Sequence, residues 1–339
     1  MMDRSILQSS FVLCVLASCN EGPRPSPELS PYPITLEGLD RRILDDPSDP
    51  ALFAQRARFH ESRDSIRAAL NDWARAIQLD STSAQWRIAL GDLYYRKVDL
   101  PKAEIEFTKA ARLAPDSTKA RLKLAELSLV QREYAEAMRW ANDALRIDDQ
   151  NAKAYFLKGW IHREAGDTAL AISSYRTAVE RDPGFYDAYI ALGLLMAQRH
   201  DPLAMQYYNS AVELRPESVE AWYDRGMYAQ ENGQDSIALA SYAQIKKIDP
   251  KNATAWYNSG YVLLEHQQRT REAREEFSRA IVELPTYAQA YFNRGLTYEL
   301  EGSLDSALVD YKRSLALAPE MDLAAAGLSR LQQKGLKVR

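Results

Sequence analysis

The sequence contains very little cysteine and no excess of positive charge. Its two cysteines among 339 residues are Cys14 and Cys19, too few for a disulfide-stabilised scaffold or a cysteine-ligated metal site. Lysine and arginine number 43 against 47 aspartate and glutamate residues, which gives a formal net charge of −4. Nucleic-acid-binding proteins carry a basic excess that neutralises phosphates. We therefore expect no nucleic acid among the partners of this chain.

The sequence also lacks the common motifs of catalysis. It has no P-loop, no Gly-x-Ser-x-Gly, no His-Glu-x-x-His and no Gly-x-Gly-x-x-Gly. It has only four histidines, and two of them, His60 and His162, lie in separate repeats of the pattern described below. The sequence therefore predicts a protein that is not an enzyme and that uses neither a cofactor nor a metal ion.

The N-terminus has the features of an export signal. The stretch 5–18 is mostly apolar and shorter than the ~20 residues that a membrane-spanning helix needs. It ends in Leu16-Ala17-Ser18-Cys19, which resembles the lipobox of bacterial lipoproteins. The resemblance implies a signal peptide over 1–18, lipid attachment at Cys19 and a location in a bacterial envelope, where Asn20 favours the outer over the inner membrane. A plain secretory signal and a buried N-terminal helix are the alternatives.

Proline is concentrated directly after that signal. Residues 19–35 contain five prolines, which are separated by other residues: Pro23, Pro25, Pro27, Pro31 and Pro33. Because proline fixes φ and favours polyproline II, this stretch predicts a semi-rigid tether between the lipid and the rest of the chain. A single helix is expected within residues 36–49.

From residue 50 to residue 321 the chain repeats with a period of 34 residues, apart from one unit a residue short and one a residue long. Both irregularities are expected in turns between paired helices. Alanine occupies position 20 of all eight units: Ala69, Ala103, Ala137, Ala171, Ala204, Ala238, Ala273 and Ala307. Position 24 is aromatic in seven: Trp73, Phe107, Tyr175, Tyr208, Tyr242, Phe277 and Tyr311. Glycine at position 8 and proline at position 32 each recur in six units.

This small–aromatic–small–proline pattern resembles the tetratricopeptide repeat. The resemblance implies an all-α, right-handed superhelical solenoid of eight helix-turn-helix repeats over residues 50–321, with the first helix of each pair lining a concave groove. We expect the aromatic residue at position 24 to fill the space between pairs. Residues 36–49 and 322–339 would supply the capping helices that a solenoid needs to cover its apolar ends.

The family resemblance also points to candidate groove residues, since positions 2, 5, 6, 9, 12 and 13 of each first helix face the concave side in this family. From the fourth repeat onward, positions 5 and 9 are all apolar or aromatic: Phe156, Trp160, Ile190, Leu194, Tyr223, Met227, Tyr257, Tyr261, Phe292 and Leu296. Exposed apolar surface of this size usually binds a partner. Internal packing of these side chains is the alternative.

Polar residues at neighbouring groove positions suggest the chemistry of the partner. Asp224 and Glu265 are acidic, and the groove positions of repeats five to eight contain no lysine or arginine. Asn258 and Asn293 match asparagines that bind extended peptide backbones in some relatives. These residues favour an extended protein or peptide segment with apolar and basic side chains.

The sequence leaves three functions open. The leading one is a non-enzymatic scaffold, tethered to a membrane only through the lipid on Cys19. The second is a non-catalytic subunit that regulates an envelope enzyme or assembly machine. The third is a structural homo-oligomer in which one copy binds another.

Overall fold

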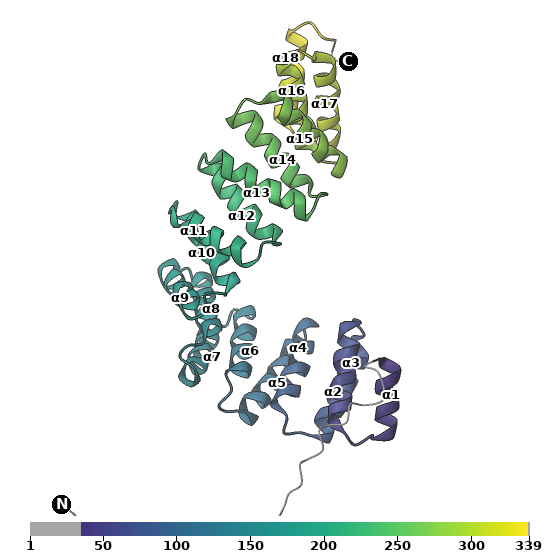
Figure 1. Cartoon of the computed structure of the whole chain (residues 1–339), viewed down its shortest axis with the longest axis vertical. Coiled ribbons are helices and arrows are strands. Elements are labelled where there is room, and N and C mark those ends of the chain that lie inside the picture. Colours follow the sequence, from purple (N-terminus) through teal and green to yellow (C-terminus); the bar gives the residue numbers. More distant parts are fainter. Residues whose placement is uncertain (1–34, 338–339) are drawn as a thin grey trace, which may run out of the picture. The chain divides into compact units, whose positions relative to one another are not determined.

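The computed structural model describes residues 35–337. The predicted signal peptide, the lipidation site Cys19 and all of the tether except Thr35 lie outside the described residues. Within the described part, every regular element is a helix, which confirms the predicted all-α class (Figure 1). No helix between residues 35 and 337 combines the length and apolar character needed to cross a membrane.

The helices follow one another with short turns. Their bounds are α1 Leu36–Asp45, α2 Pro50–Ser62, α3 Ile66–Leu79, α4 Ala84–Arg96, α5 Leu100–Leu113, α6 Thr118–Val130, α7 Tyr134–Ile147, α8 Ala152–Glu164, α9 Thr168–Arg181, α10 Tyr186–Gln198, α11 Leu203–Leu214, α12 Val219–Glu231, α13 Asp235–Ile248, α14 Ala253–Tyr261, the π-helix η1 Val262–His266, α15 Thr270–Glu283, α16 Ala288–Leu300, α17 Leu304–Leu317 and α18 Asp322–Gln333.

The chain divides into two compact units, of which the second begins at Arg87. In the first unit α1 packs on α2 and α2 on α3, around the fully buried side chains of Leu39, Ala57 and Trp73. In the second unit, successive pairs from α6/α7 to α16/α17 pack on one another, and α18 packs on α17. Each helix buries one face against its partner and another against the next pair, as expected for stacked repeats.

Close packing within a pair depends on the glycine at position 8. A Cβ atom added to Gly193 would lie 2.5 Å from the ring of Tyr208, and one added to Gly159 would lie 2.5 Å from the ring of Tyr175. The same contact joins Gly91 to Phe107, Gly226 to Tyr242, Gly260 to Phe277 and Gly295 to Tyr311. The position-24 ring therefore covers the glycine of its own pair, in addition to the predicted contact with the next pair, which Tyr208 makes with Tyr228 at 6.0 Å between ring centroids.

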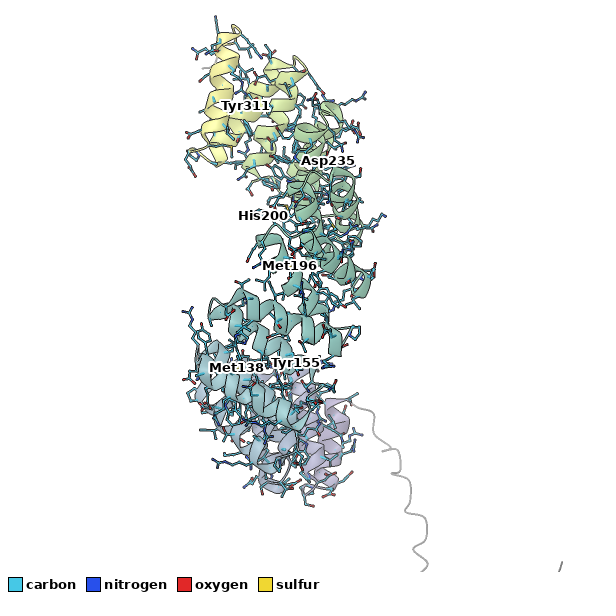
Figure 2. The ribbon with its side chains drawn as sticks, turned by 90° about the vertical axis from the view of Figure 1, so that its left-hand side faces the viewer. Met138, Tyr155, Met196, His200, Asp235 and Tyr311 are labelled. Carbon is cyan, nitrogen blue, oxygen red and sulfur yellow. The ribbon has the colours of Figure 1, made fainter. Side chains whose placement is uncertain are left out.

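The turn inside each pair requires one residue with positive φ. Glycine holds this conformation in three repeats, for instance at Gly166 with φ 83°. In the other five, an ordinary residue does so: Asp64, Val98, Arg132, His200 and Gln268; His200 is labelled in Figure 2. A branched side chain such as that of Val98, at φ 59°, is strained in this region.

We expect Val98→Gly to stabilise the protein by about 1 kcal/mol, because it removes this strain. Val98 is 77% exposed, so the replacement sacrifices little packing. Gly166→Val is the matched opposite change, since no atom lies within 4 Å of an added Cβ there. Urea denaturation followed by circular dichroism should show shifts of opposite sign for the two variants. Shifts of the same sign would mean that backbone strain does not govern these turns.

Both length irregularities lie in helices and not in the turns where they were predicted. The extra residue of the seventh unit is not in the turn: α14 continues beyond Tyr261 as the π-helix η1, a usual way for a helix to absorb an inserted residue. At the end of η1, His266 Nδ1 lies 2.7 Å from Asp235 Oδ1 of the preceding repeat. In the fifth unit, the missing residue shortens α11, which has 12 residues where α9 has 14.

Candidate functional site

Two adjoining cavities lie along the first helices of the second unit. Cavity A has a volume of about 250 Å³ and is lined by Tyr95, Glu126, Val130, Lys153, Phe156, Leu157, Trp160, Phe185 and Asp187. Cavity B has a volume of about 190 Å³ and is lined by Phe156, Trp160, Arg163, Tyr175, Asp187, Ile190, Ala191 and Leu194. The two cavities share the side chains of Phe156, Trp160 and Asp187, so one layer of rings on α8 separates them.

Neighbouring rings fix that separating layer in place. The ring of Phe156 meets Phe185 edge-on, with centroids 5.1 Å apart, and lies 5.4 Å from Tyr175. Trp160 is half-buried and lies 6.4 Å from Phe156 between centroids. Rigid aromatic side chains lose little entropy on binding, which suits them as anchors for a partner.

Four of the ten predicted apolar groove residues come together at these cavities: Phe156, Trp160, Ile190 and Leu194. Ile190 is buried there, whereas Leu194 remains 40% exposed at the rim. The other predicted residues lie farther along the repeats and are half-buried against neighbouring helices. Tyr223 and Met227 pack on the cluster around Tyr242, Leu296 on that around Phe277 and Phe292 on Tyr311, while Tyr261 lies edge-on to His266.

Tyr257 and the two predicted asparagines are engaged within the fold. The ring of Tyr257 lies 4.8 Å from that of Tyr287 and 5.7 Å from that of Phe277. Its hydroxyl accepts a hydrogen bond of 3.0 Å from the Asn293 amide, and the Asn258 amide donates to Met227 Sδ at 3.5 Å. Because both amides are buried, a ligand main chain could reach them only by displacing these contacts.

Charges are distributed unevenly along the first helices. From α4 to α8 they pair with one another: Lys123 Nζ lies 2.9 Å from Asp92 Oδ1, and Lys153 Nζ lies 2.5 Å from Glu126 Oε1. On α12 and in η1, four acids have carboxylates that form no hydrogen bond or ion pair with any residue in the described range 35–337: Glu220, Asp224, Glu231 and Glu265. The groove charges are therefore neutralised near α6, whereas α12 and η1 carry unpaired negative charge.

Asp224 is the most unusual of these acids. Its side chain is half-buried, and burial, reinforced by nearby Glu220, raises the pKa of Asp224 to about 6. Its neighbour Arg225 makes no ion pair with it: that guanidinium donates to Asn209 Oδ1 and Ser241 Oγ, each at 2.7 Å. A half-buried carboxylate without a partner is costly to keep charged, and a cation placed beside it would relieve that cost.

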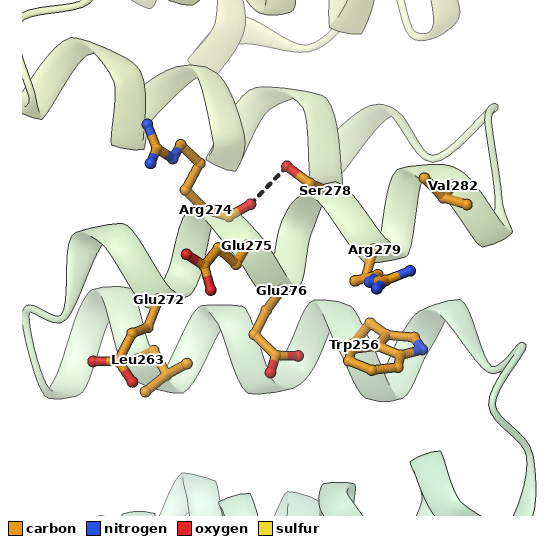
Figure 3. Close-up of a pocket in the computed structure, with 9 residues that line it drawn as sticks. All are labelled: Trp256, Leu263, Glu272, Arg274, Glu275, Glu276, Ser278, Arg279 and Val282. Atoms are coloured by element: carbon orange, nitrogen blue, oxygen red, sulfur yellow. Dashed lines mark hydrogen bonds between the residues drawn. The ribbon is translucent and has the colours of Figure 1, made fainter.

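A larger depression of about 670 Å³ lies over α15, with Trp256 and Leu263 contributing from the preceding elements (Figure 3). Several of its charged residues are already paired: Glu276 with Lys246 at 2.9 Å, Arg274 with Glu301 at 2.7 Å, and Glu272 with Arg269. None of the predicted groove residues lines it. Size alone therefore does not make it the better candidate.

Sequence reasoning missed several residues that line cavity A. Tyr95 and Val130 stand at positions 12 and 13 of their repeats, which the family pattern places on the groove side, so the sequence held a signal for them. Phe185 gave no such signal, because it precedes α10 in a connecting turn. Among residues 35–337 there is no group of three or more histidine, cysteine, aspartate or glutamate side chains that could hold a metal ion.

Family models described as tetratricopeptide repeat match residues 56–118, 106–152, 156–219, 223–288 and 288–321, well over half of the sequence. Among solved structures, the C-terminal part of a TPR repeat-containing protein from Cytophaga hutchinsonii is 19% identical. That match covers 71% of this chain and 99% of that one with a TM-score of 0.60. A tetratricopeptide repeat protein from Parabacteroides merdae is 18% identical over 74% of this chain and 98% of that one, with a TM-score of 0.46. MamA is 24% identical, in a match that covers 51% of this chain and 94% of that one, with a TM-score of 0.47. At 19% identity, the structure from Cytophaga hutchinsonii supports the fold alone.

Proposed function

Because the chain belongs to the tetratricopeptide repeat family, we propose that it is a non-enzymatic scaffold that binds partner proteins through the groove of its first helices. The observation that carries this proposal is the pair of cavities A and B, which are lined by half-buried aromatic rings and bordered by exposed apolar side chains. Surfaces of this composition are typical of protein interfaces.

The proposed partner presents an extended segment with apolar and basic residues. The apolar part follows from the rings of Phe156 and Trp160. The basic part follows from the acids on α12 and η1, whose carboxylates form no ion pair within the described residues. Complementary charge of this kind speeds encounter and selects among partners.

A test of the scaffold proposal is photo-crosslinking in intact cells with a photoreactive residue at position 194, on the rim of cavity B. We expect a specific protein adduct that decreases about tenfold or more when Trp160→Ala is added, because hot-spot rings contribute most of the binding energy. Trp140→Ala is the matched control, a half-buried tryptophan on the second helix α7. Adducts that persist in Trp160→Ala, or that form equally from position 309 on α17, would contradict the proposal.

We further propose that lipid on Cys19 holds the scaffold on a bacterial envelope membrane, more specifically the outer membrane. Several acyl chains on one residue anchor a protein stably, whereas a single chain gives only marginal binding. Cys19→Ala should therefore shift the protein from the detergent phase to the aqueous phase, or leave an unprocessed precursor. Cys14→Ala is the control, since residue 14 would leave with the signal. A lipid-labelled Cys19→Ala protein in the detergent phase would contradict the anchor.

A further inference from the structure

We infer that cavities A and B receive two apolar side chains, one residue apart, from a single extended partner segment, and that Asp224 receives a lysine or arginine of the same segment. The inference rests on the proposed scaffold function. It adds the side-chain spacing that the partner must have and names the residue that binds the partner's basic side chain.

The two cavities have the size of single side chains and adjoin each other at Phe156 and Trp160. At about 250 and 190 Å³, each is smaller than the ~300–1,000 Å³ pockets that hold whole small molecules. They share the ring layer of Phe156 and Trp160, so their contents would be separated by that layer. In an extended chain, alternate side chains point to the same side and lie ~6.6–6.8 Å apart, which allows residues i and i+2 to enter adjacent cavities.

The chemistry of the rims favours apolar occupants. Val130 at cavity A is 48% exposed, and Leu194 at cavity B is 40% exposed. The two cations beside them are already paired, Lys153 with Glu126 at 2.5 Å and Arg163 with Glu164 at 2.9 Å. An apolar side chain in either cavity would bury the exposed carbon of Val130 or Leu194.

The position of Asp224 determines how far along the partner segment the basic residue should lie from the two apolar residues. Cavity B lies on α8 and α10, and Asp224 is on α12, the next first helix along the groove. Neighbouring packed helices lie ~8–10 Å apart. The next residue of an extended segment on the same side lies ~6.6–6.8 Å farther along, and the length of a lysine or arginine side chain covers the remainder. Asp187 is a competing acceptor for the same cation, since its only ion-pair partner in the described residues, Arg215, lies 3.8 Å away and both side chains are more than half exposed.

The predicted recognition pattern is therefore apolar-x-apolar-x-basic, in which all three side chains point to the same side of an extended segment. The contacts do not depend on chain direction, so the reversed order basic-x-apolar-x-apolar presents the same three groups. The probes are two fluorescent peptides, Gly-Ser-Leu-Ser-Leu-Ser-Lys-Ser-Ser-Gly and its reverse, measured by anisotropy against the full chain in detergent. We expect at least one of them to bind, and about tenfold weaker binding when its lysine is replaced by glutamate.

Matched variants test each contact separately. Val130→Ser and Leu194→Ser should each lower the affinity for the peptide by about three- to tenfold. Neither substitution should change the affinity for a peptide in which the leucine that fills its cavity is replaced by serine. Asp224→Asn should reduce the preference for lysine over glutamate to about twofold or less. Val309→Ser, an exposed valine on α17, is the control and should have no effect.

Three results would overturn the inference: neither peptide binds, a peptide with one leucine binds as well as one with two, or Asp224→Asn keeps the preference for lysine. These results are distinguishable from failure of the scaffold proposal itself. A Trp160-dependent adduct from position 194 in cells would still support a groove-binding scaffold, with a partner that uses a different pattern. Loss of both the adduct and the peptide binding would remove the proposed function as well.

Discussion

Tyr208→Ala is expected to destabilise the protein by about 3–5 kcal/mol, because it removes a ring that is only 2% exposed and leaves a cavity between helices. The ring covers Gly193 of its own pair and lies 6.0 Å from Tyr228 between centroids. Since each repeat contacts mainly its neighbours, the loss should concentrate in repeats four to six. Hydrogen exchange of the amides in α8–α13 is the direct measurement.

The partner change, Gly193→Ala, should also destabilise, by about 1–3 kcal/mol, because its Cβ would lie 2.5 Å from the Tyr208 ring. Combining the two changes is the informative experiment. Without the ring the added methyl group has room, and alanine is the better helix former by about 1 kcal/mol. Gly193→Ala should therefore change sign and stabilise the Tyr208→Ala variant.

The chain already contains this combination. In the third repeat the same two positions hold Ala125 and Ala141, both fully buried, so a small pair can replace the glycine–ring pair. A double-mutant cycle measured by hydrogen exchange should give a coupling of at least about 1 kcal/mol. Additive effects would mean that the glycine is present for a reason other than the ring.

The repeat pattern predicted the helices well because the same repeat positions are buried in successive helix pairs. Alanine at position 20 and proline at position 32 mark positions where only certain side chains fit, so the eight helix pairs could be predicted from the sequence. The contact of the Tyr208 ring with Gly193 could not, because the rotation of each helix about its axis decides which of several neighbours a side chain meets.

The groove was harder to predict for the same physical reason. Tyr257 and Asn293 occupy positions that face the concave side in the family, yet the hydroxyl and the amide are 3.0 Å apart and bond to each other across neighbouring repeats. The sequence does not reveal how closely successive first helices approach. The length of the seventh unit was equally ambiguous, since an added residue fits either a turn or a π-helix such as η1.

Glu299 is expected to hold the C-terminal cap together through its charge. Its carboxylate is buried on α16 and accepts hydrogen bonds from Arg330 Nη2 at 2.9 Å, Lys334 Nζ at 2.9 Å and Tyr311 Oη at 2.8 Å. Burial alone would raise the pKa of Glu299, but the donors on Arg330, Lys334 and Tyr311 outweigh it and lower the pKa to about 2. This acid stands at a groove position of the eighth repeat, yet α18 covers it and pairs it.

The lowered pKa determines how stability should depend on pH. A carboxylate with a depressed folded-state pKa contributes fully above its ordinary value of 4.5 and loses that contribution as pH falls toward about 2. We expect Glu299→Gln to weaken protection of α16–α18 by about 2–3 kcal/mol at pH 7. The difference from the unmodified protein should shrink steadily between pH 4.5 and pH 2.

Hydrogen exchange of the α16–α18 amides at several pH values is the measurement, with Glu320→Gln as the control. Glu320 is exposed in the turn before α18, so its replacement should leave protection unchanged at every pH. Because the Arg330 and Lys334 side chains are 42% and 48% exposed, they can turn to water in Glu299→Gln, and the loss should stay local to the cap. A loss of equal size at pH 3 and pH 7 would instead assign the effect to altered packing around residue 299, and the charge would then not be what secures α18.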